Sequence, residues 1–361
     1  MNHVIAVDAM GGDNAPRAIV HASFNAARNG IPILLFGDIQ LIEPLLDEFA
    51  LKAHMQWRNL PITITHTTQI IAMGQEPSRT VVTKKDSSLV RAVQAVADGH
   101  ASAVISAGNS GAAMVAGTFI LGRLPGIDRP AIGEFIPTKK GSIFCMDLGV
   151  NTDCRTEFLE QFAYMGHAYV KIVKNITNPR IALLSNGAED YKGSMAVKQT
   201  FDVLKNSPLN FVGNLESRDM FDDHADVLVC DGFVGNVLLK GIQGTVRAMT
   251  FWINEERKKS WVYSLGLFLS KGLFKNLRNT IDYSRMHGAL LLGINHPLII
   301  AHGNSNEISI EQSIIFAHQV AQQQLITQFN SELKKTLTTK QAAFEFVAAQ
   351  KSTAMSDQAQ L

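Results

Sequence analysis

The stretch that decides the fold is Val4-Ile5-Ala6-Val7-Asp8-Ala9-Met10-Gly11-Gly12-Asp13. Its first four residues are apolar and mostly β-branched, which predicts a buried strand. Asp8 follows at the carboxyl end of that strand, and the two glycines allow the backbone to turn and to bring N–H groups close to an anion. Asp13 or Asn14 is predicted to cap the next helix. The turn is therefore either a simple tight turn or an anion-binding edge.

The same construction recurs along the chain. Apolar runs at 103–107, 181–184, 227–230 and 297–301 each lead into a polar, glycine-containing turn and then into a predicted helix. This alternation indicates a largely parallel sheet covered by helices on both faces, which is a three-layer α/β/α sandwich. Ligands bind outside the carboxyl ends of parallel strands, so we expect the polar turns to converge on one rim.

The composition is that of a soluble globular protein. The chain has 361 residues, of which 46% are hydrophobic and 18% charged, and its formal net charge is +1. A balance this close to zero predicts no nucleic-acid partner. The three cysteines show no C-x-x-C spacing, which predicts reduced thiols and neither a disulfide framework nor a zinc site. We expect no signal peptide and no membrane span, because the first residues enter a strand and no run of 18 apolar residues occurs.

The domain organisation predicted from these patterns is one large domain with one excursion. Residues 1–335 are expected to form a single α/β domain, and a helical excursion is expected at about 245–285 within it. Residues 336–361 are rich in alanine, glutamine and serine, which predicts a helix that ends in a flexible tail.

The predicted rim lacks the usual signatures of covalent, metal or nucleotide chemistry. The sequence contains no G-x-S-x-G, H-E-x-x-H, G-x-x-x-x-G-K-[ST] or G-x-G-x-x-G motif. What remains is a lysine among glycines, amides and hydroxyls, a set that suits an anion that is itself the reactant. The candidate anion- and substrate-binding residues are Asp8, Gly11, Gly12, Asp13, Ser106, Gly108, Asn109, Ser110, Gly111, Ser185, Asn186, Gly187, Glu189, Gly193, Asp231, Gly232, Gly235, His302, Gly303 and Ser305.

Each of these candidates also has a purely structural interpretation. Small residues in the turns equally serve close packing of a helix on a sheet. His302 is an acid/base group, an anion ligand or a structural histidine. The run Asp222-Asp223-His224 is a metal site or a solvated loop, and the solvated loop is favoured. No metal is predicted.

The segment 257–278 differs from the rest of the chain. It carries six lysines or arginines and no acid, interleaved with bulky apolar residues. On a helical projection, Lys271, Lys275 and Arg278 form a basic strip beside the apolar side chains. Such a strip suits an anionic membrane surface, and the alternatives are a buried helix pair or a dimer contact. The predicted membrane-facing residues are Trp261, Leu265, Phe268, Leu269, Lys271, Leu273 and Lys275.

The chain resembles a known family, the acyl-acyl-carrier-protein:phosphate acyltransferases of bacterial phospholipid synthesis. The resemblance runs from Val4 to about Phe329 and depends on seven stretches in order. These are Ala6-Val7-Asp8-Ala9-Met10-Gly11-Gly12-Asp13, Lys84-Lys85-Asp86-Ser87-Ser88, Ser106-Ala107-Gly108-Asn109-Ser110-Gly111-Ala112, Gly126-Ile127-Asp128-Arg129-Pro130-Ala131, Asp231-Gly232-Phe233-Val234-Gly235-Asn236, Asp282-Tyr283-Ser284 and Ala301-His302-Gly303-Asn304-Ser305.

Two places depart from the family pattern. After the 181–184 strand the family usually has asparagine, an aliphatic residue and glycine, where this chain has Ser185, Asn186 and Gly187. Near residue 288 the family usually reads Gly-Gly-Ala, and this chain reads His287-Gly288-Ala289. These changes affect single contacts rather than the reaction.

The resemblance implies transfer of a long-chain fatty acyl group from acyl carrier protein to inorganic phosphate, which gives acyl phosphate for phospholipid synthesis. It also implies a fold related to phosphotransacetylases and isocitrate-dehydrogenase-like proteins, a homodimer, and a cytoplasmic protein associated peripherally with the inner face of the cell membrane. No cofactor is implied. Lys192, which lies in the most polar turn and matches the family, is predicted to be the chief cationic contact to phosphate or to the developing oxyanion.

Asn109 and Asn236 are predicted to donate side-chain hydrogen bonds at the same rim, with Asn236 counted beside Lys192 as catalytic. Either asparagine is otherwise a helix cap. Two other functions remain open. One is a short-chain phosphotransacetylase that uses coenzyme A, and the other is a membrane-recruited scaffold for acyl carrier protein without catalytic activity.

Overall fold

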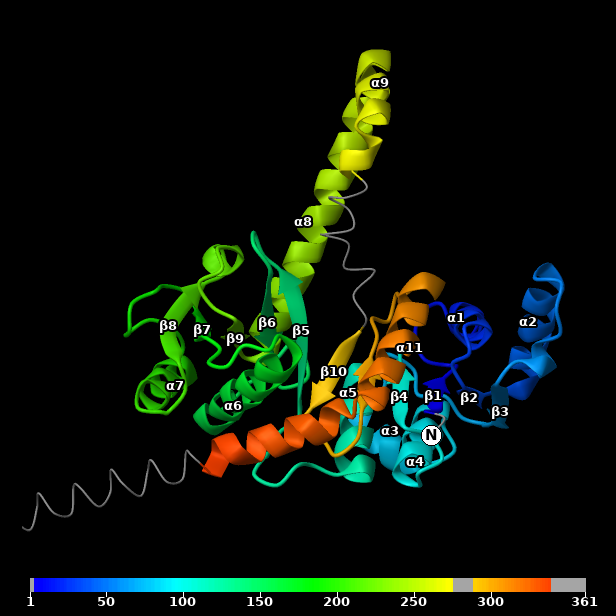
Figure 1. Ribbon diagram of the computed structural model, residues 1–361, viewed down its shortest axis with the longest axis horizontal. Coiled ribbons are helices and arrows are strands. Elements are labelled where there is room, and N and C mark those ends of the chain that lie inside the picture. Colours follow the sequence, from blue (N-terminus) through cyan, green and yellow to red (C-terminus); the bar gives the residue numbers. More distant parts are fainter. Residues whose placement is uncertain (1–2, 275–287, 339–361) are drawn as a thin grey trace, which may run out of the picture. The chain divides into compact units, whose positions relative to one another are not determined.

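The computed structural model describes residues 3–274 and 288–338, and it divides the chain into two compact units (Figure 1). Unit 1 comprises Met1–Gly126 and Asn236–Gln324, and unit 2 comprises Ile127–Gly235 and Leu325–Leu361. The sequence pattern, which treats residues 1–335 as one domain, does not reveal this division, because strands and helices alternate in the same way in both units.

Unit 1 is built on a mostly parallel run of strands in the order β3-β2-β1-β4-β11-β10. These strands are β1 (Ile5–Asp8), β2 (Ile33–Gly37), β3 (Ile62–His66), β4 (Ala103–Ser106), β10 (Ala289–Leu292) and β11 (Leu298–Ile300). Only the β10–β11 pair is antiparallel among these pairings. Ile5 lies opposite both Ile33 and Ala103. The carboxyl ends of β1, β4 and β11 therefore lie at the same edge, as predicted.

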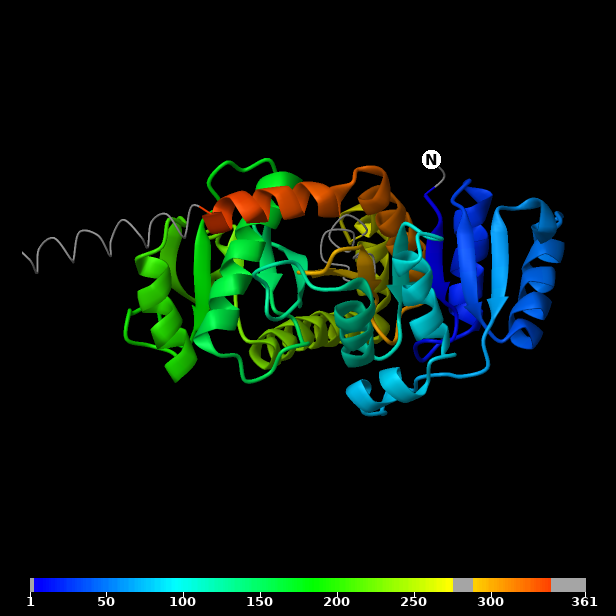
Figure 2. The ribbon, with the colours of Figure 1, turned by 90° about the horizontal axis from the view of Figure 1, so that it is seen from below.

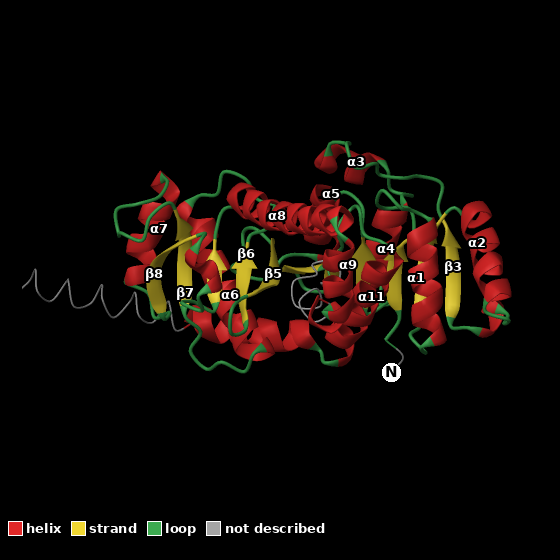
Figure 3. Cartoon of the chain, turned by 90° about the horizontal axis from the view of Figure 1, so that it is seen from above, coloured by secondary structure: helices red, strands yellow, loops and turns green. Residues whose placement is uncertain are grey.

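Helices cover the strands of unit 1 (Figures 2 and 3). They are α1 (Arg17–Arg28), α2 (Ile39–Lys52), α3 (Pro77–Thr83), α4 (Ser88–Ala97), α5 (Ser110–Ala116) and α11 (Glu307–Gln322), with short turns of helix η1 (Trp57–Asn59) and η2 (Gly117–Leu121). Helix α1 packs between α2 and α11, while α4 packs on β1 and β2 and contacts α5. The reversal of strand order between β3 and β4 places α4 on the other face, because parallel crossovers are right-handed.

Local capping explains where several of these helices begin. Asp38 caps α2 by accepting a hydrogen bond from Gln40 N at 3.0 Å, and Ser87 caps α4. The cap predicted for α1 at Asp13 or Asn14 is wrong. Helix α1 starts after Pro16 without a side-chain cap. The Asn14 amide instead donates to the carbonyls of Asn304 and Ser305, because the turn after β11 lies beside it.

Two other boundaries depend on local contacts. Part of the polar stretch 73–79 is helical, because the Glu76 carboxylate accepts from the backbone N–H groups of Ser78 and Arg79 and so starts α3. The helical stretch that follows β11 is broken. Gln324 takes a left-handed conformation (φ 51°), α11 ends before it, and a second helix at 325–338 belongs to unit 2.

Unit 2 has the strand order β5-β6-β9-β7-β8. Its elements are β5 (Ala131–Pro137), β6 (Ser142–Met146), α6 (Thr156–Val173), β7 (Ile181–Ser185), α7 (Met195–Lys205), β8 (Phe211–Glu216), η3 (Asp219–Phe221) and β9 (Val227–Val229). The β5–β6 pair is antiparallel and the other pairs are parallel. Phe135, Phe144, Tyr169 and Phe329 form a chain of ring contacts between β5, β6, α6 and the 325–338 helix.

Two consecutive helices contain most of the predicted excursion. Helix α8 (Gly232–Lys259) begins in unit 2 and continues in unit 1, and α9 (Trp261–Leu269) follows it after Ser260 (Figure 1). No side chain of α9 is buried, and Trp261, Phe268 and Leu269 are each more than two-thirds exposed. The buried-helix-pair alternative for this segment is therefore wrong for α9. Lys275 and Arg278 lie outside the described residues.

Within the described parts of the chain, no helix is both long enough and apolar enough to span a bilayer.

One carboxyl group in unit 2 is buried without a hydrogen-bond partner among the described residues. Glu134 of β5 is 6% exposed, and neither of its carboxylate oxygens has a hydrogen-bond partner among the described residues. Burial raises the pKa of Glu134 to about 7, from an ordinary value of 4.5. Between these two pH values the unfolded chain loses a proton that the folded chain keeps, so stability falls as pH rises from 4.5 to 7.

We expect Glu134→Gln to remove that pH dependence. A shift of this size corresponds to about 3 kcal/mol of lost stability above pH 7, so the variant should be more stable than the wild type at pH 8 and close to it at pH 4.5. The measurement is the urea midpoint at both pH values. Asp202→Asn, at an exposed carboxylate of α7, is the matched control and should show no such difference. Equal gains at both pH values would contradict this account.

Candidate functional site

Three polar turns of unit 1 meet at the carboxyl edge of the sheet. These turns follow β1, β4 and β11. The backbone N–H of Asp13 donates to Gly303 O at 2.7 Å, and that of Ala301 donates to Ser106 O at 2.9 Å. The structure thus brings together the candidates that the sequence assigned to these turns: Asp8, Gly11, Gly12, Asp13, Ser106, Gly108, Asn109, Ser110, Gly111, His302, Gly303 and Ser305.

Asp8 is the buried centre of this edge. Its side chain is 3% exposed and accepts a hydrogen bond from Ser106 Oγ at 2.7 Å and one from Met10 N at 3.2 Å. Ser106 Oγ in turn accepts from Gly108 N at 3.1 Å. Burial raises the pKa of Asp8, and hydrogen bonds from Ser88, Ser106 and the first turn partly offset this rise. The carboxylate therefore fixes two turns and is screened from solvent.

The glycines around Asp8 are required by space. A Cβ on Gly11 would lie 2.5 Å from Asp8 Oδ2 and 2.8 Å from Gly108 N. Gly12 has φ +104°, and a Cβ there would lie 2.9 Å from Ala107 O. Both side-chain-free positions let the backbones of the β1 and β4 turns approach each other. The packing interpretation of these glycines is thus supported, and it is compatible with anion binding at the same edge.

Asn109 caps α5 and also ties down a neighbouring loop. Its Oδ1 accepts from Ala112 N at 3.0 Å, while Nδ2 donates to the carbonyls of Met73 and Gln75 at 3.0 and 2.9 Å. These bonds account for the amide hydrogens of the side chain. They favour the cap interpretation, and they leave Ser110 and Gly111, the first residues of α5, to present backbone N–H groups.

His302 is half-buried beside these turns. Burial lowers its pKa, and the positive charge of Lys240 lowers it further. The imidazole is therefore neutral near pH 7, which makes it a weak electrostatic partner for an anion. Its backbone carbonyl accepts from Ser305 N at 3.0 Å, so the residue also shapes the β11 turn.

Unit 2 contains a second buried carboxylate that sequence reasoning missed. Asp147 follows β6 and is fully buried. Its oxygens accept from Asn151 N at 2.7 Å, Asn151 Nδ2 at 2.9 Å, and the N–H groups of Ile132, Gly149 and Val150. Burial raises the pKa of Asp147 to about 6 against these bonds. The available signal was an aspartate directly after an apolar strand, as at Asp8.

The predicted turn at 231–236 packs on Asp147. Asp231 accepts from Phe233 N at 2.8 Å and from Cys154 N at 2.7 Å, so it caps α8. A Cβ on Gly232 would lie 2.5 Å from Asn151 O, and one on Gly235 would lie 1.9 Å from Asp147 O. Asn236 lies one turn into α8 and not at its start, so it is not the cap.

The loop that carries Lys192 is held by its own hydrogen bonds. Gly193 N donates to Asn186 Oδ1 at 2.9 Å, and Lys192 N donates to Glu189 O at 3.0 Å. A Cβ on Gly187 would lie 2.8 Å from Cγ of Lys192, so this glycine makes room for the lysine stem. The lysine is half-buried, and its Nζ lies 5.5 Å from the centre of the Tyr191 ring. The structure therefore groups Ser185, Asn186, Gly187, Glu189, Lys192 and Gly193 in one loop of unit 2.

Metal and thiol chemistry have no support in the described residues. No group of three histidine, cysteine or acidic side chains there is placed to hold a metal ion. In the run 222–224, Asp222 pairs with Lys139, and Asp223 accepts from Lys140 N at 3.0 Å and from Thr138. These contacts fit the loop interpretation. The three cysteines are buried free thiols, and burial raises the pKa of each.

Comparison with known proteins decides the family. The family model described as "Fatty acid synthesis protein" matches residues 3–328. The chain belongs to this family.

Members named "Phosphate acyltransferase" are similar over nearly their full length. The protein from Geotalea uraniireducens is 44% identical over 319 residues, which are 88% of this chain and 90% of that protein. The protein from Geobacter sulfurreducens is 43% identical over 344 residues, which are 95% and 98% of the two chains. The protein from Geobacillus thermodenitrificans is 42% identical over 335 residues, or 92% and 99%.

Solved structures support the fold. A phosphotransacetylase from Streptococcus pyogenes superposes with a TM-score of 0.56 at 17% identity, over 89% of this chain and 94% of that one. A branched-chain phosphotransacylase from Enterococcus faecalis gives a TM-score of 0.50 at 15% identity, over 88% and 99%. At such identities the likeness concerns the fold alone. The expected α/β fold of the phosphotransacetylase type is thereby confirmed.

The contact of Gly235 with Asp147 predicts a sharp difference between two glycines of the same helix. Gly235→Ala would force a Cβ onto a backbone oxygen, and we expect it to cost at least about 3 kcal/mol of stability or to prevent folding. Gly241→Ala in α8 meets nothing within 4 Å and should gain about 0.5–1 kcal/mol through helix propensity. The melting temperatures of Gly235→Ala and Gly241→Ala, each compared with that of the wild type, measure this difference. Equal melting temperatures would show that the turn relaxes freely.

Proposed function

We propose that this chain is a phosphate acyltransferase that moves a long-chain fatty acyl group from acyl carrier protein to inorganic phosphate. The observation that carries the proposal is the high identity, over nearly the whole chain, to family members with the name phosphate acyltransferase. The site residues support it independently. They offer backbone N–H groups, amides and a lysine on glycine-rich turns, and they offer no activated thiol or hydroxyl.

The chemistry needs only positioning and charge stabilisation. A phosphate oxygen attacks the thioester carbonyl carbon, a tetrahedral oxyanion forms, and the C–S bond then breaks to release the carrier thiolate, which takes up a proton. Phosphate is already nucleophilic near neutral pH, so no residue has to form a covalent intermediate. The protein must hold phosphate in line with the carbonyl and stabilise the oxyanion. Backbone N–H groups and one cation provide both.

The residues divide into contacting and positioning groups in this proposal. Lys192 is the cationic contact, and Asn236 adds an amide. The backbone N–H groups of Gly12 and Ser110 face the anion, while that of Gly11 donates to Asp8. Asp8 acts through Ser106 as a positioning residue, because its buried carboxylate holds both turns in place.

A direct test also separates the competing functions. Wild-type protein is incubated with palmitoyl-acyl carrier protein and phosphate, and acyl phosphate is detected by mass. A coenzyme A enzyme would use acetyl-coenzyme A and leave the palmitoyl carrier protein intact. A scaffold would bind the carrier protein without turnover. Either result would overturn the proposal.

We expect Lys192→Ala to lower turnover about 10²–10³-fold, since this is the typical loss for one preorganised transition-state contact. The measurement is the rate of acyl phosphate formation at saturating phosphate, with folding checked by circular dichroism. Lys205→Ala is the matched control. Lys205 belongs to the same unit and pairs with Asp190 at 3.0 Å at the surface, so its loss should leave the rate unchanged. Near-wild-type turnover in Lys192→Ala would show that Lys192 is not the cationic contact.

We further propose that α9 binds an anionic membrane surface and that the protein is a homodimer. The support is the exposure of its apolar side chains: Trp261, Leu265, Phe268 and Leu269 are 76, 47, 69 and 76% exposed. Leu273 (68%) and the exposed Lys271 continue this surface. Lys258 and Lys259 pair with Glu255 and Glu256 at 2.5 Å, so they contribute little net charge. Lipid binding then depends mostly on apolar insertion, and two copies in a dimer add avidity.

We expect Leu265→Glu and Phe268→Glu to abolish sedimentation with vesicles of anionic phospholipid, because a carboxylate cannot enter the headgroup boundary. Leu51→Glu is the matched control, since Leu51 is 77% exposed and lies on α2, outside α9. Size-exclusion chromatography of the same variants tests the dimer-contact alternative, which predicts monomers or aggregates. If the wild type fails to sediment at low salt, the membrane proposal is lost.

A further inference from the structure

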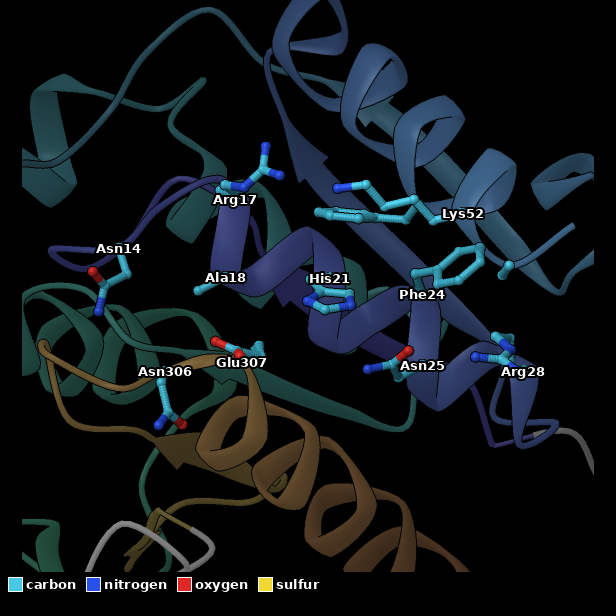
Figure 4. A pocket seen from close by; sticks show the side chains of 12 residues that line it. Asn14, Arg17, Ala18, His21, Phe24, Asn25, Arg28, Lys52, Asn306 and Glu307 are labelled. Carbon is cyan, nitrogen blue, oxygen red and sulfur yellow. The ribbon is translucent and has the colours of Figure 1, made fainter. Parts of the chain in front are cut away.

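A cavity of about 770 Å³, which no sequence pattern indicates, opens along α1 in unit 1 (Figure 4). We call it the α1 pocket. One stripe of α1 lines it, and the end of α2 and the start of α11 form its sides. The stripe is Arg17, Ala18, His21, Phe24, Asn25 and Arg28, and Asn14, which precedes the helix, lines the pocket beside it. Its spacing of three to four residues places these side chains on one face of the helix.

One end of the α1 pocket touches the candidate site. Asn14 lies there and donates to the carbonyls of Asn304 and Ser305 in the β11 turn, and Asp13 beside it bonds to Gly303. Asn306, the cap of α11, lines the same end (Figure 4). The other end is marked by Arg28, the last residue of α1. The pocket thus leads away from the polar turns along the length of the helix.

We propose that the α1 pocket binds the phosphopantetheine arm of the acyl carrier protein, with the thioester toward the polar turns and the phosphodiester at Arg28. This inference rests on the proposed acyl-transfer function. The arm is a narrow chain of methylenes, two amides and a gem-dimethyl group that ends in a phosphodiester. Each of these features has a counterpart in the pocket.

The lengths agree. From Arg17 to Arg28 the helix rises about 16 Å, at 1.5 Å per residue. Thirteen bonds separate sulfur from phosphorus in the arm, which corresponds to roughly 15 Å for an extended chain at 3.3–3.6 Å per three-bond peptide unit. A thioester at the polar turns therefore places the phosphodiester within reach of the Arg28 guanidinium.

The lining matches the middle of the arm. The His21 ring stacks on Phe49 with ring centroids 4.4 Å apart and an interplanar angle of 19°. Phe24, which is 2% exposed, continues this apolar surface. Methylene and gem-dimethyl groups pack on such surfaces. The Nδ2 groups of Asn14 and Asn25 already donate to the β11 turn and to Glu311, which leaves their Oδ1 atoms along the pocket to accept from the two amide N–H groups of the arm.

The charge distribution orients the arm. Arg17 and Lys52 both contact Glu48 at 2.6 Å, so these three groups together carry one positive charge. The Arg28 guanidinium lies 5.9 Å from the Phe24 ring centre and forms no ion pair within the part of the chain that the structure describes. Glu307 lies at the opposite end, near the polar turns. A phosphodiester is therefore favoured at the Arg28 end.

The test compares Michaelis constants for palmitoyl-acyl carrier protein, palmitoyl-coenzyme A and palmitoyl-pantetheine, which lacks the phosphate. We expect Arg28→Ala to raise KM about tenfold for both phosphorylated thioesters, because a charge-assisted bond is lost. KM for palmitoyl-pantetheine and for phosphate should not change. In Arg28→Lys, KM for the two phosphorylated thioesters should return most of the way to the wild-type value. Ala53→Trp fills the pocket and should raise KM for all three thioesters. Arg91→Ala, at an exposed position of α4, is the control and should change none.

Three results would overturn the inference. Unchanged constants in both Arg28→Ala and Ala53→Trp would place the arm elsewhere, while acyl phosphate formation by the wild type would still support the proposed function. An effect of Arg28→Ala on the carrier protein alone would show a contact with the carrier surface and not with the arm. If the wild type makes no acyl phosphate, calorimetric titration with 4′-phosphopantetheine tests the pocket independently of the reaction. The inference would be overturned if the wild type does not bind this compound, or if wild type and Arg28→Ala bind it equally well.

Discussion

The burial of the Asp8 carboxylate is the constraint on which the rest of the unit 1 site depends. Burying a carboxyl group is costly unless it is hydrogen-bonded, and Asp8, unlike Glu134, has partners in Ser106 and the backbone of its own turn. These bonds join β1 to β4 at their carboxyl ends. They also leave no room for a Cβ at Gly11. One buried charge therefore dictates the glycine content of the turns and the close approach of their backbones.

Unit 2 repeats this solution with different partners. Asp147 follows β6 as Asp8 follows β1, and it accepts five hydrogen bonds, four of them from the 149–151 turn. Gly235 packs against its backbone oxygen as Gly11 packs against the Asp8 carboxylate. Such rigid turns suit a reaction in which the protein contributes positioning and fixed dipoles. The buried thiols, whose pKa values are raised, agree with a reaction that uses no protein nucleophile.

The exposed surfaces serve a different purpose from the turns. The apolar side chains of α9 have no covering contacts within the described chain, so water is their neighbour unless a lipid surface or a second copy covers them. The α1 pocket, by contrast, combines aromatic side chains and amides with the Arg28 guanidinium, which forms no ion pair within the described residues. The first surface suits a partner without a fixed shape, and the second suits a slender ligand with polar groups at set distances.

The sequence by itself determined the parallel α/β fold, the polar turns after β1, β4 and β11, and the family, because strand, turn and helix signals are local and several motifs occur in order. It also set apart the segment 257–278, whose α9 side chains are exposed, while the role predicted for Lys192 stays a prediction. Only the tertiary structure decided that the Asn109 amide is used in capping α5 and holding the 72–75 loop, that Asn236 lies inside α8, and that the helix after β11 breaks at Gln324. The division into two units and the α1 pocket also escaped the sequence, because each depends on contacts between residues far apart in the chain, and periodicity carries no information about such contacts. Asp147 was missed although its signal, an aspartate directly after an apolar strand, is local.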